Sequence, residues 1–267
     1  MDLLAERALI GMIHLPALPT APGSALSMDD LIAFAVDEAH RLASAGLDAA
    51  IVENVGDVPL FREHVPPSTV AAMTAVVTEV RRHTPLVLGV NVLRNACLEA
   101  LAVAHAGGAD FIRCNVVIGA YVTDQGIVQG CAAELARLRA ALDRRVAILG
   151  DVHVKHAHPL FDVPIEDAAR DLAERGGVDA VVVSGARSAE PPSLSRLQSV
   201  REAVDLPVLV GSGVGLDNVA SFFERSDGLI LGEVDFKAGR RWGGASDPGA
   251  YAEAVRRCRG SKRFRYR

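Results

Sequence analysis

Three side chains that can move protons or bind anions occupy alternate positions after an apolar run. In the segment "ILGDVHVKHAHPL", residues 148–160, they are Asp151, His153 and Lys155. Because successive strand side chains point to opposite faces, an extended chain places these three on one wall and the intervening valines on the other. Histidine titrates near neutral pH, and neighbouring carboxylate and ammonium groups tune it. The spacing predicts that Asp151 and His153 transfer protons while Lys155 polarises a carbonyl or forms a Schiff base.

A structural role for the same residues is the alternative. Asp151 and Lys155 would then form a buried ion pair that closes the fold. The two roles predict different behaviour of the variant Asp151→Asn. If Asp151 acts in catalysis alone, the variant loses activity and keeps nearly the same melting temperature.

A recurring phrase indicates which elements position these residues. A glycine or serine that ends a helix is followed by an aspartate and then by an apolar, β-branched run, in "AGLDAAIVEN" (45–54), "GGADFIRCN" (107–115), "GGVDAVVVSG" (176–185) and "RSDGLILG" (225–232). Near-continuous apolar strands are typical of a parallel sheet that is covered on both faces. The sequence predicts four further strands, at 8–15, 86–91, 147–152 and 207–213.

Segments with helical periodicity separate the eight predicted strands. Eight β-α units in one domain predict an α/β fold, a (β/α)₈ TIM barrel, over residues 1–258, followed by a basic tail at 259–267. A doubly wound open sheet is the alternative. Such sheets usually carry Gly-x-Gly-x-x-Gly after the first strand, whereas here that strand runs into "HLPALPTAPG".

Polar residues gather where the predicted strands end, which is where TIM barrels place their active sites. Glu53 joins Asp151, His153 and Lys155 as a predicted catalytic residue. Asp124 lies in "VVIGAYVTDQGIVQG" (116–130), a connection long enough to reach over the mouth of the barrel. The predicted substrate-binding residues are His14, Asn91, Arg113, Asn115, Asp124 and Ser184.

Glycine-rich turns follow the last two predicted strands, in "VLVGSGVGLDN" (208–218) and "LILGEV" (229–234). Backbone N–H groups in such turns can approach a phosphate closely. The predicted phosphate-binding residues are Gly211, Ser212, Gly213 and Gly232. Glu233 argues against this site unless its carboxylate points outward.

The residue types near the mouth also bear on cofactors. No His-x-x-x-His or clustered acidic signature occurs, and the four cysteines form no Cys-x-x-Cys pair, so the sequence predicts no metal site and no required cofactor. A divalent cation held by His14, Glu53, Asp151 and His153 is an open alternative.

Composition and charge limit the cellular setting and the partners. The 267 residues carry a net charge of −5, and no apolar run reaches the roughly 20 residues of a membrane span. We therefore expect a cytoplasmic protein without a membrane span. Residues 256–267 hold seven lysines and arginines and no acid. This basic end could contact RNA, but we expect it to be a flexible terminus or to dock on an acidic neighbouring subunit of a homo-oligomer.

At several of these segments the sequence closely resembles the BtpA family, also called BtpA/SgcQ. The resemblance is carried by "GMIHLPALPTAPG", "DAAIVENVGDVP", "GVNVLRN", "ADFIRCNVVIGAYVTDQGIVQG", "DVHVKHAHPL" and "VLVGSGV". It covers almost the whole chain to about residue 235. The resemblance implies a ribulose-phosphate-binding barrel, in agreement with the fold expected from the strand pattern.

Two classes of function follow. The first is an enzyme that uses acid–base chemistry on a small phosphorylated sugar or nucleoside-like substrate, as an isomerase, a lyase or an enzyme that cleaves a glycosyl bond. The second, implied by the family name, is a non-enzymatic assembly or regulatory factor of the photosystem I biogenesis type. A strand-end cluster of ionisable residues favours the enzyme.

Overall fold

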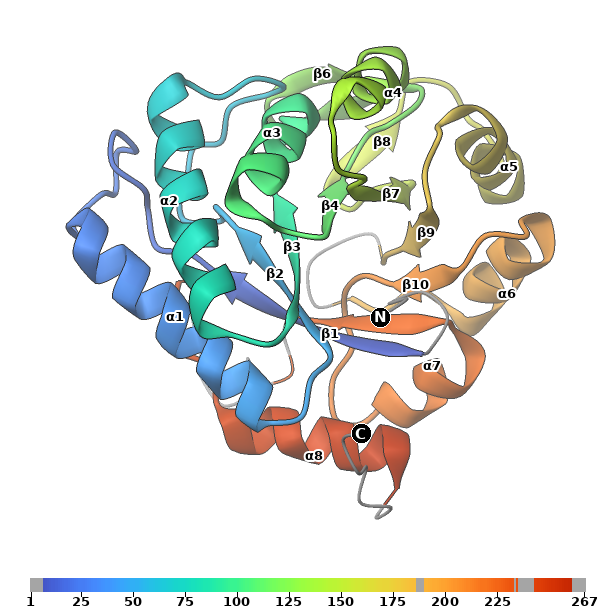
Figure 1. Cartoon of the computed structure of the whole chain (residues 1–267). Coiled ribbons are helices and arrows are strands. Elements are labelled where there is room, and N and C mark those ends of the chain that lie inside the picture. The colour runs from blue at the N-terminus through green and yellow to red at the C-terminus, as the bar shows by residue number, and fades with distance from the viewer. Residues whose placement is uncertain (1–6, 186–189, 233, 235–242, 261–267) are drawn as a thin grey trace.

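The computed structural model describes residues 7–185, 190–232, 234 and 243–260. Eight parallel strands close into a barrel in the order β1-β11-β10-β9-β7-β4-β3-β2 (Figure 1). Their bounds are Ala8–His14 (β1), Ala49–Glu53 (β2), Val87–Asn91 (β3), Phe111–Cys114 (β4), Ala147–Val152 (β7), Ala180–Val183 (β9), Val208–Val210 (β10) and Gly228–Leu231 (β11). The predicted single-domain (β/α)₈ barrel is confirmed, and each barrel strand falls within a predicted strand segment.

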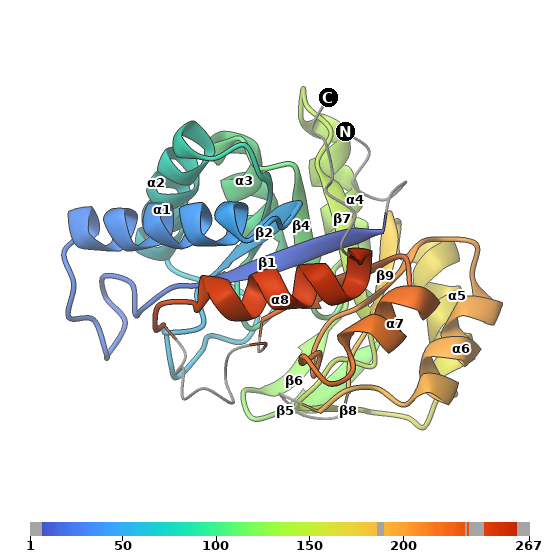
Figure 2. The ribbon, with the colours of Figure 1, turned by 90° about the horizontal axis from the view of Figure 1, so that it is seen from below.

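The helices surround the ring of strands, as Figures 1 and 2 show. Their bounds are Met28–Ser44 (α1), Pro67–His83 (α2), Cys97–Gly107 (α3), Ala132–Ala141 (α4), Ile165–Arg175 (α5), Leu194–Ala203 (α6), Val219–Arg225 (α7) and Pro248–Arg259 (α8). A glycine with positive φ follows the ends of α1, α3, α5 and α8, as in the cap of α3 at Gly108, whose φ is 80°. No described helix is both long and apolar enough to cross a membrane.

The aspartate of the recurring phrase ties neighbouring strands together at their amino ends. In each case a carboxylate oxygen accepts the backbone N–H at the start of the preceding barrel strand, over 2.8 to 2.9 Å, and an arginine from a helix binds the same aspartate. We call these four groups the aspartate clamps: Asp48 with Leu9 and Arg259, Asp110 with Leu88 and Arg81, Asp179 with Ile148 and Arg139, and Asp227 with Val208 and Arg201. The aspartates of the phrase are therefore structural and lie at the end of the barrel opposite the polar residues at the strand ends.

The inside of the barrel is apolar over its amino-terminal half. Inward-facing side chains of eleven residues form one buried cluster there: Ala8, Ile10, Met12, Ala49, Ile51, Phe111, Leu149, Ala180, Val182, Leu209 and Ile230. Gly89 leaves the space that the Phe111 ring fills, because a Cβ at Gly89 would lie 2.3 Å from that ring. We call this cluster the apolar plug. It supports the next inward-facing side chains toward the carboxyl ends of the strands.

Residues 116–130 do not form the irregular loop that their length led us to expect. They contain the strands β5 (Ala120–Thr123) and β6 (Gly126–Gln129), which pair antiparallel. β8 (Ala157–Pro159), from the segment after β7, pairs antiparallel with the other side of β5. Figure 2 shows this three-stranded sheet beside the barrel. The connections after β4 and β7 are thus joined into one unit.

The predicted basic tail lies mostly outside the described residues, which end at residue 260. The helix α8 continues to Arg259, one residue into the predicted tail. The role of the tail and the expected homo-oligomer stay predictions.

Candidate active site at the carboxyl end of the barrel

Each barrel strand contributes one inward position to a layer directly above the apolar plug, because inward positions recur every second residue. We call this set the polar layer; it consists of His14, Glu53, Asn91, Arg113, Asp151, Ser184, Gly211 and Gly232. The six that carry side chains are all buried, from 0% exposure at Ser184 to 8% at Glu53. The structure therefore brings together one predicted site residue from every strand.

Asp151 is held by two neighbours from β4 and its extension. Arg113 Nε and Nη2 donate to the two carboxylate oxygens of Asp151, each over 2.9 Å, in a bidentate pair. Asn115 Nδ2 donates to Asp151 Oδ2 over 3.1 Å. The ion-pair partner of Asp151 in this layer is therefore Arg113, whereas the structural alternative from the sequence paired it with Lys155.

Glu53 lies on the other side of the layer, between β1 and β3. Asn91 Nδ2 donates to Glu53 Oε2 over 2.7 Å, and His14 Nε2 lies 3.8 Å from Glu53 Oε1. Burial raises the pKa of the Glu53 carboxyl, and the positive charges of Lys155 and Arg113 and the Asn91 hydrogen bond only partly offset this effect. A carboxyl with a raised pKa beside an imidazole is suited to proton transfer near neutral pH.

The predicted alternation after β7 is wrong at His153. The strand ends at Val152, and His153 takes a left-handed backbone conformation with φ of 48°. Its ring consequently turns to the Tyr121 ring, which it meets edge-on at 6.4 Å between centroids. Lys155 is half-buried, and its charge acts on Glu53. Asp151 and Lys155 thus lie at the mouth of the barrel, whereas His153 does not. The catalytic roles assigned to all three residues stay predictions.

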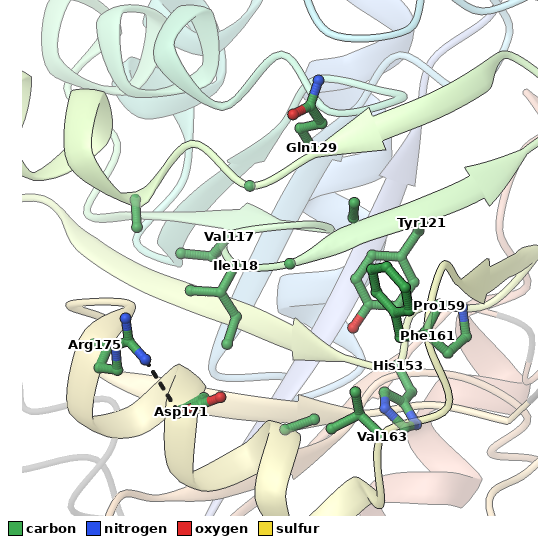
Figure 3. A pocket seen from close by; sticks show the side chains of 15 residues that line it. Val117, Ile118, Tyr121, Gln129, His153, Pro159, Phe161, Val163, Asp171 and Arg175 are labelled. Carbon is green, nitrogen blue, oxygen red and sulfur yellow. Dashed lines mark ion pairs between the residues drawn. The ribbon is translucent and has the colours of Figure 1, made fainter.

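His153 lines a separate cavity of about 480 Å³ between the three-stranded sheet and α5 (Figure 3). Tyr121 and the exposed Phe161 give this cavity aromatic walls, and the ion pair of Asp171 and Arg175 lies at one side. Burial, followed by the nearby Arg196 charge, lowers the pKa of His153. The imidazole is therefore largely neutral at pH 7.

Three buried polar atoms above or within the polar layer have no hydrogen-bond partner among the described residues. They are Asn115 Oδ1, Ser184 Oγ and Ser212 Oγ. A Cβ at Gly211 would lie 2.8 Å from Ser184 Oγ and 3.0 Å from Arg113 Nη2, so the lack of a side chain there keeps these groups unobstructed. Unsatisfied buried groups are costly, which makes these atoms candidates for bonds to a ligand.

The predicted phosphate-binding residues divide into two groups. Gly211 and Gly232 belong to the polar layer, where a Cβ at Gly232 would lie 3.3 Å from His14 Cε1. Gly213 has φ of 70°, and a Cβ there would lie 2.1 Å from the backbone nitrogen of Pro191. Another segment of the chain therefore packs directly on Gly213. Glu233, on which the charge argument depended, lies outside the described residues.

Asp124 is exposed at the tip of the β5–β6 hairpin, where Gln125 Nε2 donates to it over 2.7 Å. Burial lowers the pKa of Arg94, and the charges of Asp151, Asp124 and Glu53 partly oppose that shift. Arg94 was not among the site residues predicted from the sequence. Its position in "NVLRN", three residues after Asn91, was the available signal.

The open alternative of a divalent cation needed His14, Glu53, Asp151 and His153 to converge. They do not converge, because His153 turns toward Tyr121 and both oxygens of Asp151 bind Arg113. In the described part of the chain no three His, Cys, Asp or Glu side chains are arranged to hold a metal ion.

Comparison with known proteins places this architecture among relatives. The model of the BtpA family matches residues 5–247. A protein of Pyrococcus horikoshii is 45% identical over 235 residues, and the match covers 88% of this chain and 90% of the Pyrococcus protein. The photosystem I biogenesis protein BtpA of Synechocystis is 41% identical, and the match covers 84% of this chain and 78% of the Synechocystis protein. A mitochondrial protein of Caenorhabditis elegans is 35% identical, over 97% and 96% of the two chains.

Solved structures resemble this chain in fold. Thiamine phosphate pyrophosphorylase from Pyrococcus furiosus superposes with a TM-score of 0.60 at 13% identity, covering 96% of this chain and 98% of its own. The (S)-3-O-geranylgeranylglyceryl phosphate synthase of Thermoplasma acidophilum, solved with sn-glycerol-1-phosphate, gives a TM-score of 0.56 at 16% identity, with 95% of each chain covered. Identities this low establish the TIM-barrel fold alone.

Proposed function

This chain belongs to the BtpA family, and on that premise we propose that it is an enzyme that performs acid–base chemistry on a small phosphorylated sugar or nucleoside-like substrate. The observation that carries the proposal is the buried polar layer, in which a carboxyl group of raised pKa lies beside an imidazole at the carboxyl end of a barrel. The fold neighbours whose names include a phosphorylated compound favour that substrate class.

Glu53 is the proton-transfer residue in this proposal. Burial raises the pKa of this carboxyl, which favours its use in proton transfer, while Asn91 fixes one oxygen and leaves the other near His14. His14 lies within ion-pair distance of Glu53, so it can take up or return the proton through its Nε2. Proton movement of this kind serves an isomerase, a lyase or a glycosyl-bond-cleaving enzyme.

Asp151 has an electrostatic role rather than a proton-transfer role. Both of its oxygens accept charge-assisted hydrogen bonds from Arg113, so neither oxygen is left uncommitted. The pair orients Asn115, whose Oδ1 lacks a partner among the described residues, as do the hydroxyls of Ser184 and Ser212. We assign these three groups to the hydroxyls of the substrate.

The experiment is a screen of sugar phosphates, sugars and nucleosides, with the shift in melting temperature as the first readout and turnover of the stabilising compounds as the second. The screen is run with and without divalent metal, which also tests the open question of a cofactor. The proposal expects at least one compound to be converted by the wild-type protein and Glu53→Gln to lower its turnover at least about 100-fold. The variant Glu134→Gln, in the exposed first turn of α4, is the matched control. Unchanged turnover in Glu53→Gln would contradict the assignment.

The second candidate function is an assembly factor. The observation that favours it is the 41% identity to a Synechocystis protein named for photosystem I biogenesis. An assembly role that needs no chemistry would survive Glu53→Gln. Complementation of a Synechocystis strain that lacks its own protein, by the wild-type chain and by Glu53→Gln, separates the two candidates.

A further inference from the structure

The glycine turn after β10 has little room for a phosphate. A Cβ at Gly213 would lie 2.2 Å from the carbonyl carbon of Glu190, and a Cβ at Gly185 would lie 2.0 Å from the Glu190 oxygen. The Glu190 peptide therefore lies between these two glycines. Its carbonyl oxygen is an acceptor, which repels the oxygens of a phosphate. An anion at the mouth needs another set of donors.

Arg94 provides a cation on the opposite side of the mouth. It follows β3, is only 7% exposed, and its backbone N–H donates to the Phe61 carbonyl over 3.0 Å. Its Nη2 donates to the backbone carbonyl of Lys155, beyond the end of β7. The guanidinium thus bridges from the loop after β3 to the loop after β7, across the intervening strand β4, which carries Arg113.

The three carboxylates that act on Arg94 leave its charge largely uncompensated. Both oxygens of Asp151 bind Arg113, and Asp124 is exposed, so solvent screens its charge. Glu53 is buried, its Oε2 accepts from Asn91 Nδ2 over 2.7 Å, and its Oε1 lies 3.8 Å from His14 Nε2. Among the described residues, no carboxylate forms an ion pair with Arg94, and a buried guanidinium in that situation prefers an anionic ligand, to which it can present two N–H groups in a fork.

We propose that Arg94 binds the phosphate group of the substrate, on the β3–β7 side of the mouth rather than in the glycine turns. This inference rests on the proposed function and names the recognition of the same substrate. With its phosphate at Arg94, a ligand places its hydroxylated part above the polar layer, toward Glu53, Ser184 and Ser212. Glycines 211 and 232 then serve to leave space for the ligand and the neighbouring side chains.

The test compares ribose 5-phosphate with ribose as calorimetric probes of the full chain. The wild-type protein is expected to bind the phosphorylated sugar about 10- to 100-fold more tightly, the range that a charge-assisted contact to phosphate provides. Arg94→Gln should remove most of this preference while leaving the affinity for ribose within about threefold. A role of Arg94 in holding the two loops together would instead weaken both probes equally.

Three further variants make the outcome decisive. Arg94→Lys keeps the charge and should retain a preference within about tenfold of the wild type, and it also carries the test if Arg94→Gln does not fold. Arg137→Gln, on the exposed face of α4, is the control for loss of one arginine. Ser212→Ala should weaken the binding of both probes equally.

The inference is overturned if Arg94→Gln keeps the preference for the phosphorylated sugar, if Ser212→Ala abolishes that preference, or if the wild-type protein does not discriminate between the probes. The proposed function fails separately, through unchanged turnover in Glu53→Gln.

Discussion

The buried pair of Arg113 and Asp151 makes a quantitative prediction about stability. In Asp151→Asn, the side chain loses its charge and one of its two acceptor oxygens, while Arg113 stays 3% exposed and loses its counterion. Breaking a buried ion pair by removing one partner costs about 3–5 kcal/mol, and because asparagine keeps one acceptor we expect about 3 kcal/mol. For a chain of this size that loss corresponds to a fall of about 6–12 °C in melting temperature.

Urea denaturation followed by circular dichroism measures the free energy of unfolding of the wild type and of Asp151→Asn. The double variant Arg113→Met with Asp151→Leu removes both charges and leaves no buried charge without its partner. Its free energy of unfolding should therefore be close to that of the wild type and higher than that of Asp151→Asn. A loss below about 1 kcal/mol in Asp151→Asn would refute the view that Asp151 compensates Arg113. The sequence alone led to the opposite expectation, a nearly unchanged melting temperature, because it did not reveal Arg113 as the partner.

The remaining predictions concern Glu53 and one aspartate clamp. Because burial raises the pKa of Glu53 above 4.5, its ionisation opposes folding, and the stability present below about pH 4.5 is lost as the pH rises through the raised pKa. Glu53→Gln should therefore be more stable than the wild type at pH 7 and lose that advantage near pH 4 in urea titrations; lower stability at every pH would contradict this. Asp110→Asn should cost about 1 kcal/mol, because Leu88 and Arg81 lose a charged acceptor that is partly exposed. Calorimetry should find its ligand affinity unchanged, since the clamp lies at the amino end of the barrel, and a changed affinity would contradict that separation.

The barrel could be predicted from sequence because each strand is short and apolar, and the recurring phrase precedes four of the eight strands. The location of the site followed from a rule of the fold, which makes every polar residue at a strand end a candidate. His14, Glu53 and Asn91 lie in the polar layer for that reason. Their pairing with one another depends on the register between β1, β2 and β3, which the local pattern does not contain.

The failures have local physical causes. Alternation after Asp151 assumed an extended chain, and a single left-handed residue at His153 redirected its side chain. The three-stranded sheet was missed because "AYVTDQGIVQ" was treated as a loop, although two β-branched runs around Asp-Gln-Gly are typical of a hairpin. The aspartates of the recurring phrase were noticed, but the backbone N–H groups that they bind lie 19 to 39 residues away along the chain, beyond what the phrase itself shows.

The way the ring closes has a consequence for synthesis of the chain. β1 pairs with β2 on one side and with β11 on the other, and Arg259 completes the clamp at Asp48. At about 5–20 residues per second on the ribosome, residues 8–14 wait on the order of ten seconds for residues 228–231 to be made. Throughout that interval one edge of an apolar strand has no partner and is exposed to pairing with other nascent chains. Until β11 has been synthesised, β1 therefore depends on other components of the cell to keep its unpaired edge from binding other chains.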